Sequence, residues 1–179
     1  MRVTVGTKEI RYPSLDLTEG IILFTGPSGS GKTTLLRALH GELLVKDSFE
    51  NWPQNNTAMM PQQNTWIPYL KIGIQLRQFG GPNSELIARQ LQLERQLEKF
   101  PNELSVGQLQ RFSLALTLSL DSSVFLLDEP TSALDDDLAN LVFGLIDQKL
   151  KESDRTTIVA VTHDPRMKKY FSTAKMWQL

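Results

Sequence analysis

Residues 26–33 are Gly26-Pro27-Ser28-Gly29-Ser30-Gly31-Lys32-Thr33, and this stretch decides the fold. It fits the pattern G-x-x-x-x-G-K-[S/T] at every fixed position. The apolar residues 21–25 before it predict a buried strand, and residues 33–40 after it predict a helix. A glycine-rich loop in that context turns backbone N–H groups and the positive end of the helix dipole toward a phosphate. An ordinary Gly/Ser turn is the alternative, but chance matches arise in only about 1% of chains of this length.

Two side chains of this loop have predicted roles of their own. Lys32 supplies a positive charge for the β- and γ-phosphates of a nucleotide, and the hydroxyl of Thr33 is a ligand for Mg²⁺. We therefore expect the chain to bind ATP together with Mg²⁺. The expected nucleotide-binding residues of the loop and the helix start are Gly26, Pro27, Ser28, Gly29, Ser30, Gly31, Lys32, Thr33 and Thr34.

Polar side chains follow two further apolar runs that predict buried strands. Residues 124–129 have the sequence VFLLDE, which places Asp128 at a strand end, where open α/β sheets bind ligands. We expect Asp128 to hold Mg²⁺ and Glu129 to activate water as a general base. His163 follows the strand predicted at residues 157–161 and could reach the γ-phosphate. A solvated acid pair and a structural histidine are the alternatives.

The stretch LSVGQLQR at residues 104–111 has two interpretations. Ser105 and Gln108 form the S-x-x-Q pattern of a capping box, which needs no further function. The same helix start also exposes a hydroxyl and free N–H groups that can bind an anion. The residues alone leave both interpretations open.

Composition limits the class of protein. The 179 residues suit one domain, 1–179, and the net charge of −1 gives no basic footprint for nucleic acid, so no nucleic-acid partner is expected. The absence of cysteine excludes disulfides, thiolate catalysis and cysteine-ligated zinc. The apolar runs are too short to span a bilayer, so we expect any link to a membrane to come through a partner.

The order of expected elements predicts an α/β fold. Strands at residues 21–25, 124–127 and 157–161 alternate with helices, which favours a parallel sheet. A helical stretch interrupts the alternation. It consists of an amphipathic helix that starts at Asn83 and is stopped by Pro101, followed by a helix at residues 105–120. We interpret residues 63–120 as an inserted helical subdomain.

Taken in order, these motifs resemble those of the ABC ATPase family over nearly the whole chain. Residues 26–33 match its Walker A motif, and residues 124–130 match Walker B, with Glu129 as the catalytic glutamate. Residues 104–108 are similar to the family signature LSGGQ. Residues 132–135 look like the D-loop.

Two more residues fit the same family. Gln62 resembles the Q-loop glutamine, which acts in catalysis and at Mg²⁺, and His163 resembles the switch histidine. The resemblance implies a RecA-like P-loop NTPase core, with the inserted helical subdomain and a reduced antiparallel β-subdomain. The β-subdomain is expected to be reduced because residues 41–58 are few for this family.

The resemblance also implies an ATPase mechanism. Two domains, expected to form a homodimer, pack head to tail around two ATP molecules. Ser105, Gly107 and Gln108 reach the ATP that is bound by the partner chain. Hydrolysis drives an integral membrane transporter subunit, which docks near residues 62–74 and keeps this chain on the cytoplasmic face of the membrane.

The docking surface is expected to include Trp66, Ile67, Pro68 and Tyr69, for which core packing is the alternative. Two features depart from the family pattern. Val106 replaces the first glycine of the signature, and its Cβ narrows the approach to a phosphate. In addition, no aromatic residue stands at the position where the family stacks its adenine, and Tyr12 is the nearest candidate.

Two other functions compete with a transporter subunit. A non-transport ABC ATPase is one, although members active in translation carry two cassettes and repair members carry long coiled coils. A small-molecule kinase with a P-loop is the other. Glu129, residues 105–108 and Asp135 count against the kinase.

Overall fold

The computed structural model describes residues 2–5, 8–12, 17, 19–45, 56–60 and 66–179. Its centre is a parallel sheet of five strands in the order β5-β6-β7-β3-β8. These strands are β3 (Gly20–Thr25), β5 (Thr57–Met60), β6 (Val124–Asp128), β7 (Thr157–Val161) and β8 (Lys175–Gln178). The predicted parallel α/β core is therefore confirmed.

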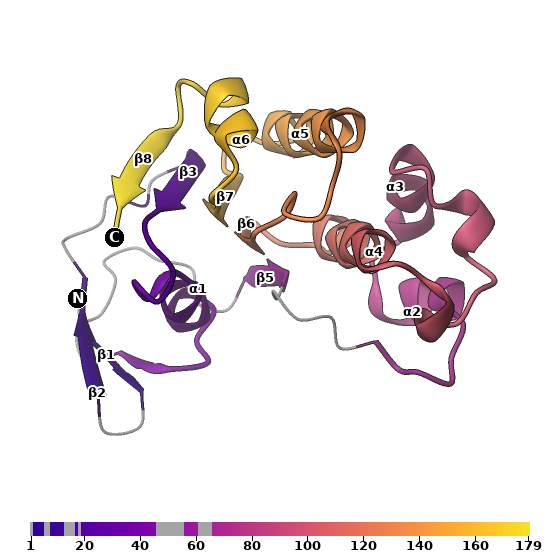
Figure 1. Cartoon of the computed structure of the whole chain (residues 1–179), viewed down its shortest axis with the longest axis horizontal. Coiled ribbons are helices and arrows are strands. Elements are labelled where there is room, and N and C mark those ends of the chain that lie inside the picture. The colour runs from indigo at the N-terminus through magenta and orange to yellow at the C-terminus, as the bar shows by residue number, and fades with distance from the viewer. Residues whose placement is uncertain (1, 6–7, 13–16, 18, 46–55, 61–65) are drawn as a thin grey trace.

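A second, small sheet lies beside the N-terminus (Figure 1). It is antiparallel, with the order β2-β1-β4. Its strands are β1 (Arg2–Val5), β2 (Lys8–Arg11) and β4 (Leu44–Val45). Their short lengths agree with the expected reduction of the β-subdomain.

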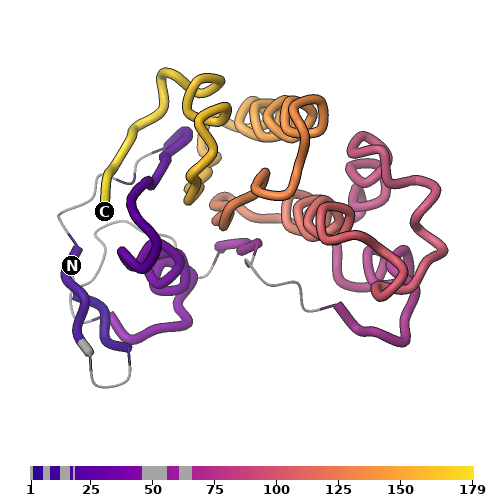
Figure 2. Tube along the Cα trace, in the orientation of Figure 1, coloured from indigo at the N-terminus to yellow at the C-terminus, as the bar shows by residue number. Residues whose placement is uncertain are grey.

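Helices cover both faces of the parallel sheet, and a helical group extends away from it, as the chain trace shows (Figure 2). The group consists of α2, α3 and the far part of α4, to the right in Figure 1. The helices are α1 (Lys32–Leu39), α2 (Ile72–Phe79), α3 (Ser84–Gln90), α4 (Val106–Ser119), α5 (Asp136–Lys151) and α6 (Pro165–Tyr170). Two 3₁₀ turns, η1 (Glu94–Gln96) and η2 (Pro101–Glu103), connect α3 to α4.

The alternation of side chains along each central strand explains why these strands are apolar throughout. In β6, Phe125 and Leu127 join the core formed with α4 and α5. Their neighbours Val124 and Leu126 join the core formed with α1. A strand with a hydrophobic core on each face needs apolar residues at every position.

One sequence-based prediction about the helical group is wrong. The helix expected from Asn83 to Pro101 ends at Gln90. The N–H of Leu93 donates to the Ala88 carbonyl, and Gln92 adopts a φ of 59°. This is a Schellman turn, which reverses the chain so that Leu93 enters the core through a turn and not along a helix face.

Candidate nucleotide-binding site

The carboxyl ends of β3, β7 and β6 meet at one edge of the sheet. Phe24 is the partner of Val161, and Val161 is the partner of Asp128. The N–H of Glu129 donates to the Val161 carbonyl at 2.9 Å, and the N–H of Thr162 donates to the Phe24 carbonyl at 3.1 Å. The chain segments that carry the predicted phosphate loop, the acid pair and His163 therefore leave the sheet side by side.

The phosphate loop has the backbone that its sequence predicts. Gly26, Gly29 and Gly31 have φ angles of 149°, 81° and 95°, which favour glycine. Lys32 is buried beneath the loop, where its ammonium donates to the Gly26 carbonyl at 3.0 Å and to the Pro27 carbonyl at 2.8 Å. The loop thus wraps around a positive charge at the start of α1, where the helix dipole adds to the attraction for an anion.

Asp128 has the properties of a cation ligand. It is 1% exposed, and neither of its carboxylate oxygens has a hydrogen-bond partner. Burial raises its pKa, while the nearby Thr33 hydroxyl and Lys32 ammonium act in the opposite direction. The Thr33 hydroxyl is thus close to Asp128 but does not complete a hydrogen bond of normal geometry. A buried carboxylate with so little compensation is costly unless a cation lies beside it, so Mg²⁺ fits beside Asp128 and Thr33.

Glu129 and His163 form the second part of the site. The His163 N–H donates to Glu129 Oε2 at 3.2 Å, and its ring Nε2 lies 3.6 Å from Glu129 Oε1. Burial raises the pKa of Glu129, and His163 partly offsets that effect. A raised pKa suits a carboxylate that must take a proton from water.

Tyr12 does not have the environment expected of an adenine-stacking residue. Its ring is 5% exposed and packs in the core beside α1. Its hydroxyl donates to the Gly31 carbonyl at 2.7 Å, and burial raises its pKa to about 12. Tyr12 therefore stabilises the phosphate loop through this hydrogen bond. Its ring is buried, so neither face is exposed for stacking on an adenine base.

The signature segment forms the expected capping box. Ser105 is the N-cap of α4, where its hydroxyl accepts from the Gln108 N–H at 3.2 Å and its own N–H donates to Gln108 Oε1 at 3.0 Å. Ser105 is exposed, and so is Val106, at 70%. Capping therefore leaves this helix start open to solvent.

The signature and the phosphate loop do not meet within one chain. Figure 1 shows α4 and α1 apart, with β5 and β6 between them. Gly107 of the signature packs against its own chain. A Cβ added at Gly107 would lie 2.9 Å from the Ala133 carbonyl oxygen.

Gln62, the predicted Q-loop residue, lies outside the described residues. Of the predicted docking residues that follow it, Trp66 is partly buried and packs edge-on against Phe112, with ring centroids 6.5 Å apart. Tyr69 is 77% exposed. The predicted surface is thus divided between the two interpretations, with Trp66 in the core and Tyr69 at the surface.

Two buried glutamines, Gln75 and Gln110, were not expected from the sequence. Gln75 donates to the carbonyls of Ile67 and Leu70 at 2.9 and 2.7 Å, and so holds the turn that presents Tyr69. Gln110 donates to the Glu129 carbonyl and accepts from the Ala133 N–H. The only sequence signal for either is a polar residue within an otherwise apolar helix face.

Comparison with known proteins identifies the family of this chain. The family model described as "ABC transporter" matches residues 11–132, which is more than half of the chain. This chain belongs to the ABC transporter family. Within it, the chain is the ATP-binding subunit.

Relatives and solved structures support the assignment. The chain is 35% identical to the ABC transporter ATP-binding protein YtlC of Bacillus subtilis, over 88% of this chain and 67% of YtlC. It is 31% identical to the glutamine transport ATP-binding protein GlnQ of Escherichia coli, over 88% of this chain and 76% of GlnQ. The fold matches the dimeric ATP-binding cassette MJ0796 bound to ADP and Pi, with a TM-score of 0.78, 23% identity, and 99% and 90% of the two chains covered.

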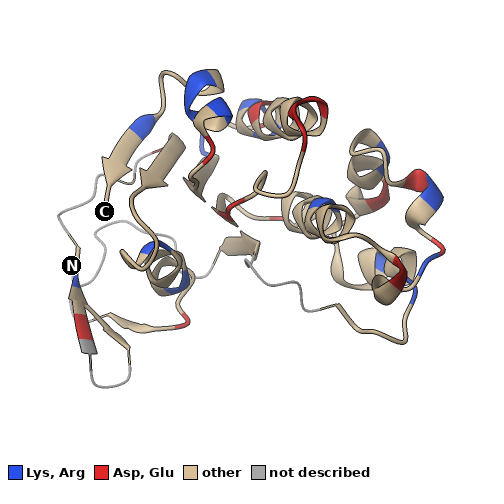
Figure 3. Cartoon of the chain, in the orientation of Figure 1, with Lys and Arg blue, Asp and Glu red and all other residues tan. Residues whose placement is uncertain are grey.

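The described residues contain neither a membrane-spanning helix nor a second metal site. None of their helices is long and apolar enough to cross a membrane. Nor do they contain a cluster of three or more His, Cys, Asp or Glu side chains that would hold a metal by themselves. Lysine and arginine are interspersed with acidic residues over the ribbon (Figure 3).

Proposed function

We propose that this chain hydrolyses ATP at the sheet edge, with Glu129 as the general base and His163 beside it. The observation that carries the proposal is the convergence of the phosphate loop, the unpartnered Asp128 and the Glu129–His163 pair at the ends of three adjacent strands. Mg²⁺ is proposed to lie between Thr33 and Asp128, with Gln62 as a third ligand. It would supply positive charge for the β- and γ-phosphates.

The complete site is proposed to need two copies of the chain. Ser105, Gly107 and Gln108 would contact the nucleotide that is bound by the partner. The separation of α4 from α1 supports this arrangement, since the exposed start of α4 has no phosphate loop of its own chain to face. The dimeric ATP-binding cassette MJ0796 shares the fold.

A membrane transporter subunit is the proposed second partner. Tyr69 lies on a turn held by Gln75, and it is exposed together with Ile74 and Phe79 of the adjacent helix α2. Exposed apolar side chains gathered on one helical group are typical of a contact surface. Through this contact the chain would lie on the cytoplasmic face of the membrane.

The substitution Glu129→Gln tests the central part of this proposal. The amide keeps the size of the side chain but cannot accept a proton, so we expect turnover to fall by about 10²–10⁴-fold while ATP still binds. Steady-state release of phosphate and equilibrium binding of Mg-ATP measure the two effects. Glu152→Gln, at the exposed end of α5, is the matched control. Turnover near that of the wild type in Glu129→Gln would refute the role of Glu129.

A further inference from the structure

The backbone leaves the sheet after Asp128 through an unusual turn. Glu129 has a φ of 50°, in the left-handed region that residues other than glycine adopt rarely. Its N–H is fixed by the Val161 carbonyl at 2.9 Å. A conformation of this kind persists only where surrounding contacts hold it. The carbonyl of Glu129 is held by hydrogen bonds as well.

Three groups donate to that carbonyl: the Ser132 N–H and hydroxyl, each at 3.3 Å, and the side chain of Gln110 from α4. Of these, Gln110 comes from outside the loop. Its Nε2 donates to the carbonyl oxygen of Glu129 and, at 3.1 Å, to Ser132 Oγ. Its Oε1 accepts from the Ala133 N–H at 3.3 Å. Because one end of the amide meets acceptors and the other meets a donor, the network fixes the orientation of the amide. Gln110 is buried, so water does not readily replace these partners.

The contact between α4 and this loop extends along one face of the helix. Gly107 lies three residues before Gln110, on the same face. A Cβ at Gly107 would lie 2.9 Å from the Ala133 carbonyl. The first turns of α4 therefore pack directly on the loop that begins at Glu129, and Gln110 supplies the polar part of that packing.

We propose that Gln110 is a positioning residue, which fixes the peptide of Glu129 so that its carboxylate stays beside His163. The proposal rests on the proposed function, in which Glu129 is the general base. In the head-to-tail dimer, α4 also presents Ser105 to the partner's nucleotide. Gln110 then links the glutamate of one ATP site to the signature of the other.

The substitution Gln110→Met tests this role, because methionine has a similar length and no hydrogen-bonding amide. A small displacement of a catalytic group lowers the rate strongly, so we expect kcat to fall by about 10- to 100-fold. The affinity for Mg-ATP, measured at equilibrium, should stay within about twofold, because the amide of Gln110 bonds to the loop at residues 129–133 and not to the phosphate loop. Gln148→Met, at an exposed position of α5, is the control for the substitution itself.

A double variant separates this inference from the function on which it rests. If Gln110 acts through Glu129, Gln110→Met adds no further loss of kcat in a Glu129→Gln background. Full turnover in Glu129→Gln alone would overturn both proposals. An inactive Glu129→Gln together with wild-type kcat in Gln110→Met would overturn the role of Gln110 only.

A milder variant covers the case in which Gln110→Met does not fold. Ser132→Ala removes one acceptor of Gln110 and one donor to Glu129, at 3.1 and 3.3 Å, and leaves the rest in place. We expect a loss of about fivefold in kcat, the effect of one hydrogen bond, without a change in nucleotide affinity. Parallel losses of kcat, nucleotide affinity and melting temperature would show that the contact is only structural, and would contradict the proposal.

Discussion

Glu129 and Asp128 are neighbours in sequence, but the fold gives them different environments. Asp128 ends β6 with both oxygens buried and unpartnered. The side chain of Glu129 is 12% exposed and lies against His163. Because successive residues at a strand end point in different directions, one carboxylate is available to a cation and the other to a water molecule. The two charges still oppose each other's ionisation, because the charge of Asp128 adds to the burial that raises the pKa of Glu129.

Val106 is the residue at which this chain departs from the signature of its family. It is the first residue of α4 and is 70% exposed, so its side chain packs against nothing in its own chain that would require valine. We expect Val106→Gly to raise ATP turnover or leave it unchanged. The loss of stability should not exceed about 1 kcal/mol, as for glycine in a first helical turn.

Phosphate release and thermal melting, measured together, check this expectation. Gly107→Ala is the informative neighbour, because its Cβ would lie 2.9 Å from the Ala133 carbonyl and should lower both stability and turnover. A Val106→Gly protein that folds well but hydrolyses no ATP would show that valine has a positive role.

At the scale of elements, the small antiparallel sheet supports the phosphate loop through Tyr12. This residue follows β2, and its hydroxyl bonds to the carbonyl at the N-cap of α1, that of Gly31. The same carbonyl accepts the first helical bond, from the Leu35 N–H at 2.8 Å. A shortened β-subdomain is thereby still connected to the nucleotide site.

The substitution Tyr12→Phe removes only this hydroxyl. One net hydrogen bond contributes about 1 kcal/mol, so we expect a modest fall in melting temperature and nucleotide binding weaker by up to about fivefold. Because the pKa of Tyr12 is raised from 10.0 to about 12, the native state binds this proton more tightly than the unfolded chain. Its contribution to stability is complete below pH 10 and is lost as the pH rises toward 12.

Denaturant unfolding at several pH values tests this account. The stability difference between wild type and Tyr12→Phe should shrink above pH 10, with Tyr69→Phe, whose tyrosine is 77% exposed, as the control. If the free energy of unfolding depended on pH in the same way for wild type and Tyr12→Phe, the raised pKa of Tyr12 would be contradicted.

Elements with a strong pattern could be predicted from the sequence. The strand at residues 157–161 and the capped helix after Ser105 were expected within a residue of where they lie. The turn at Gln92 was not expected, because a left-handed residue other than glycine has no simple sequence signature. Helix α2 was also not expected, since the polar Gln75 interrupts its apolar face in order to bond to the turn just before the helix.

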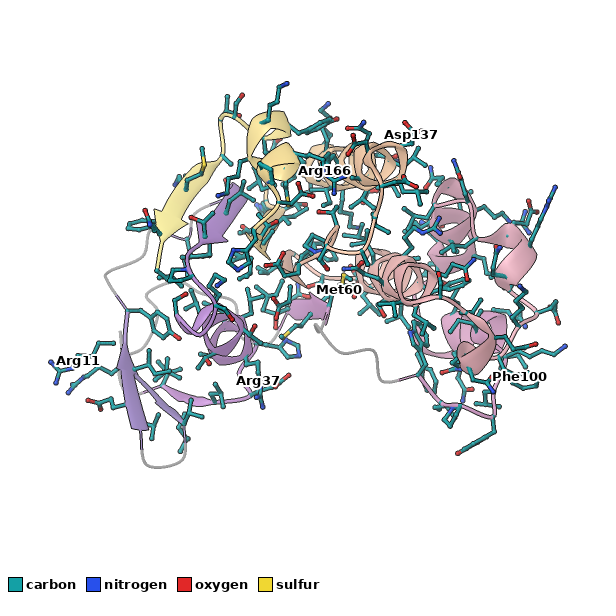
Figure 4. All side chains as sticks on the ribbon, viewed as in Figure 1. Arg11, Arg37, Met60, Phe100, Asp137 and Arg166 are labelled. Atoms are coloured by element: carbon teal, nitrogen blue, oxygen red, sulfur yellow. The ribbon has the colours of Figure 1, made fainter. Side chains whose placement is uncertain are left out.

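The site could be predicted to the same extent. Its motifs are short stretches of sequence at strand ends and can be recognised directly, whereas contacts between residues far apart in the chain leave no local pattern. Walker A, Asp128, Glu129 and His163 could be placed once the sheet was assumed to be parallel. The partners of Gln110 and of Arg166 could not. Arg166 extends from α6 toward the start of α5, where it bonds to Asp136 at 2.6 Å (Figure 4).

At the scale of the whole molecule, the separation of α4 from α1 is the feature that most affects function. One chain has a phosphate loop, the proposed general base Glu129 and a signature helix, but the signature lies away from its own phosphate loop. A head-to-tail dimer with two-fold symmetry would complete both sites at once. The loop held by Gln110 would then connect them.

The composite site is tested most directly in a covalently linked dimer that carries Lys32→Ala in one copy and Ser105→Arg in the other. Each variant should be inactive as a homodimer, because both of its sites are defective. In the linked dimer, one site combines intact Lys32 with intact Ser105, and the other carries both lesions.

The account predicts that this linked dimer hydrolyses ATP at up to about half the rate of a linked wild-type dimer, since one of two sites is intact. A linked dimer with one wild-type copy and one copy carrying both lesions is the control, because there each site keeps one defect. Activity in that control but not in the mixed dimer would place Lys32 and Ser105 of one chain in the same site, and would contradict the account.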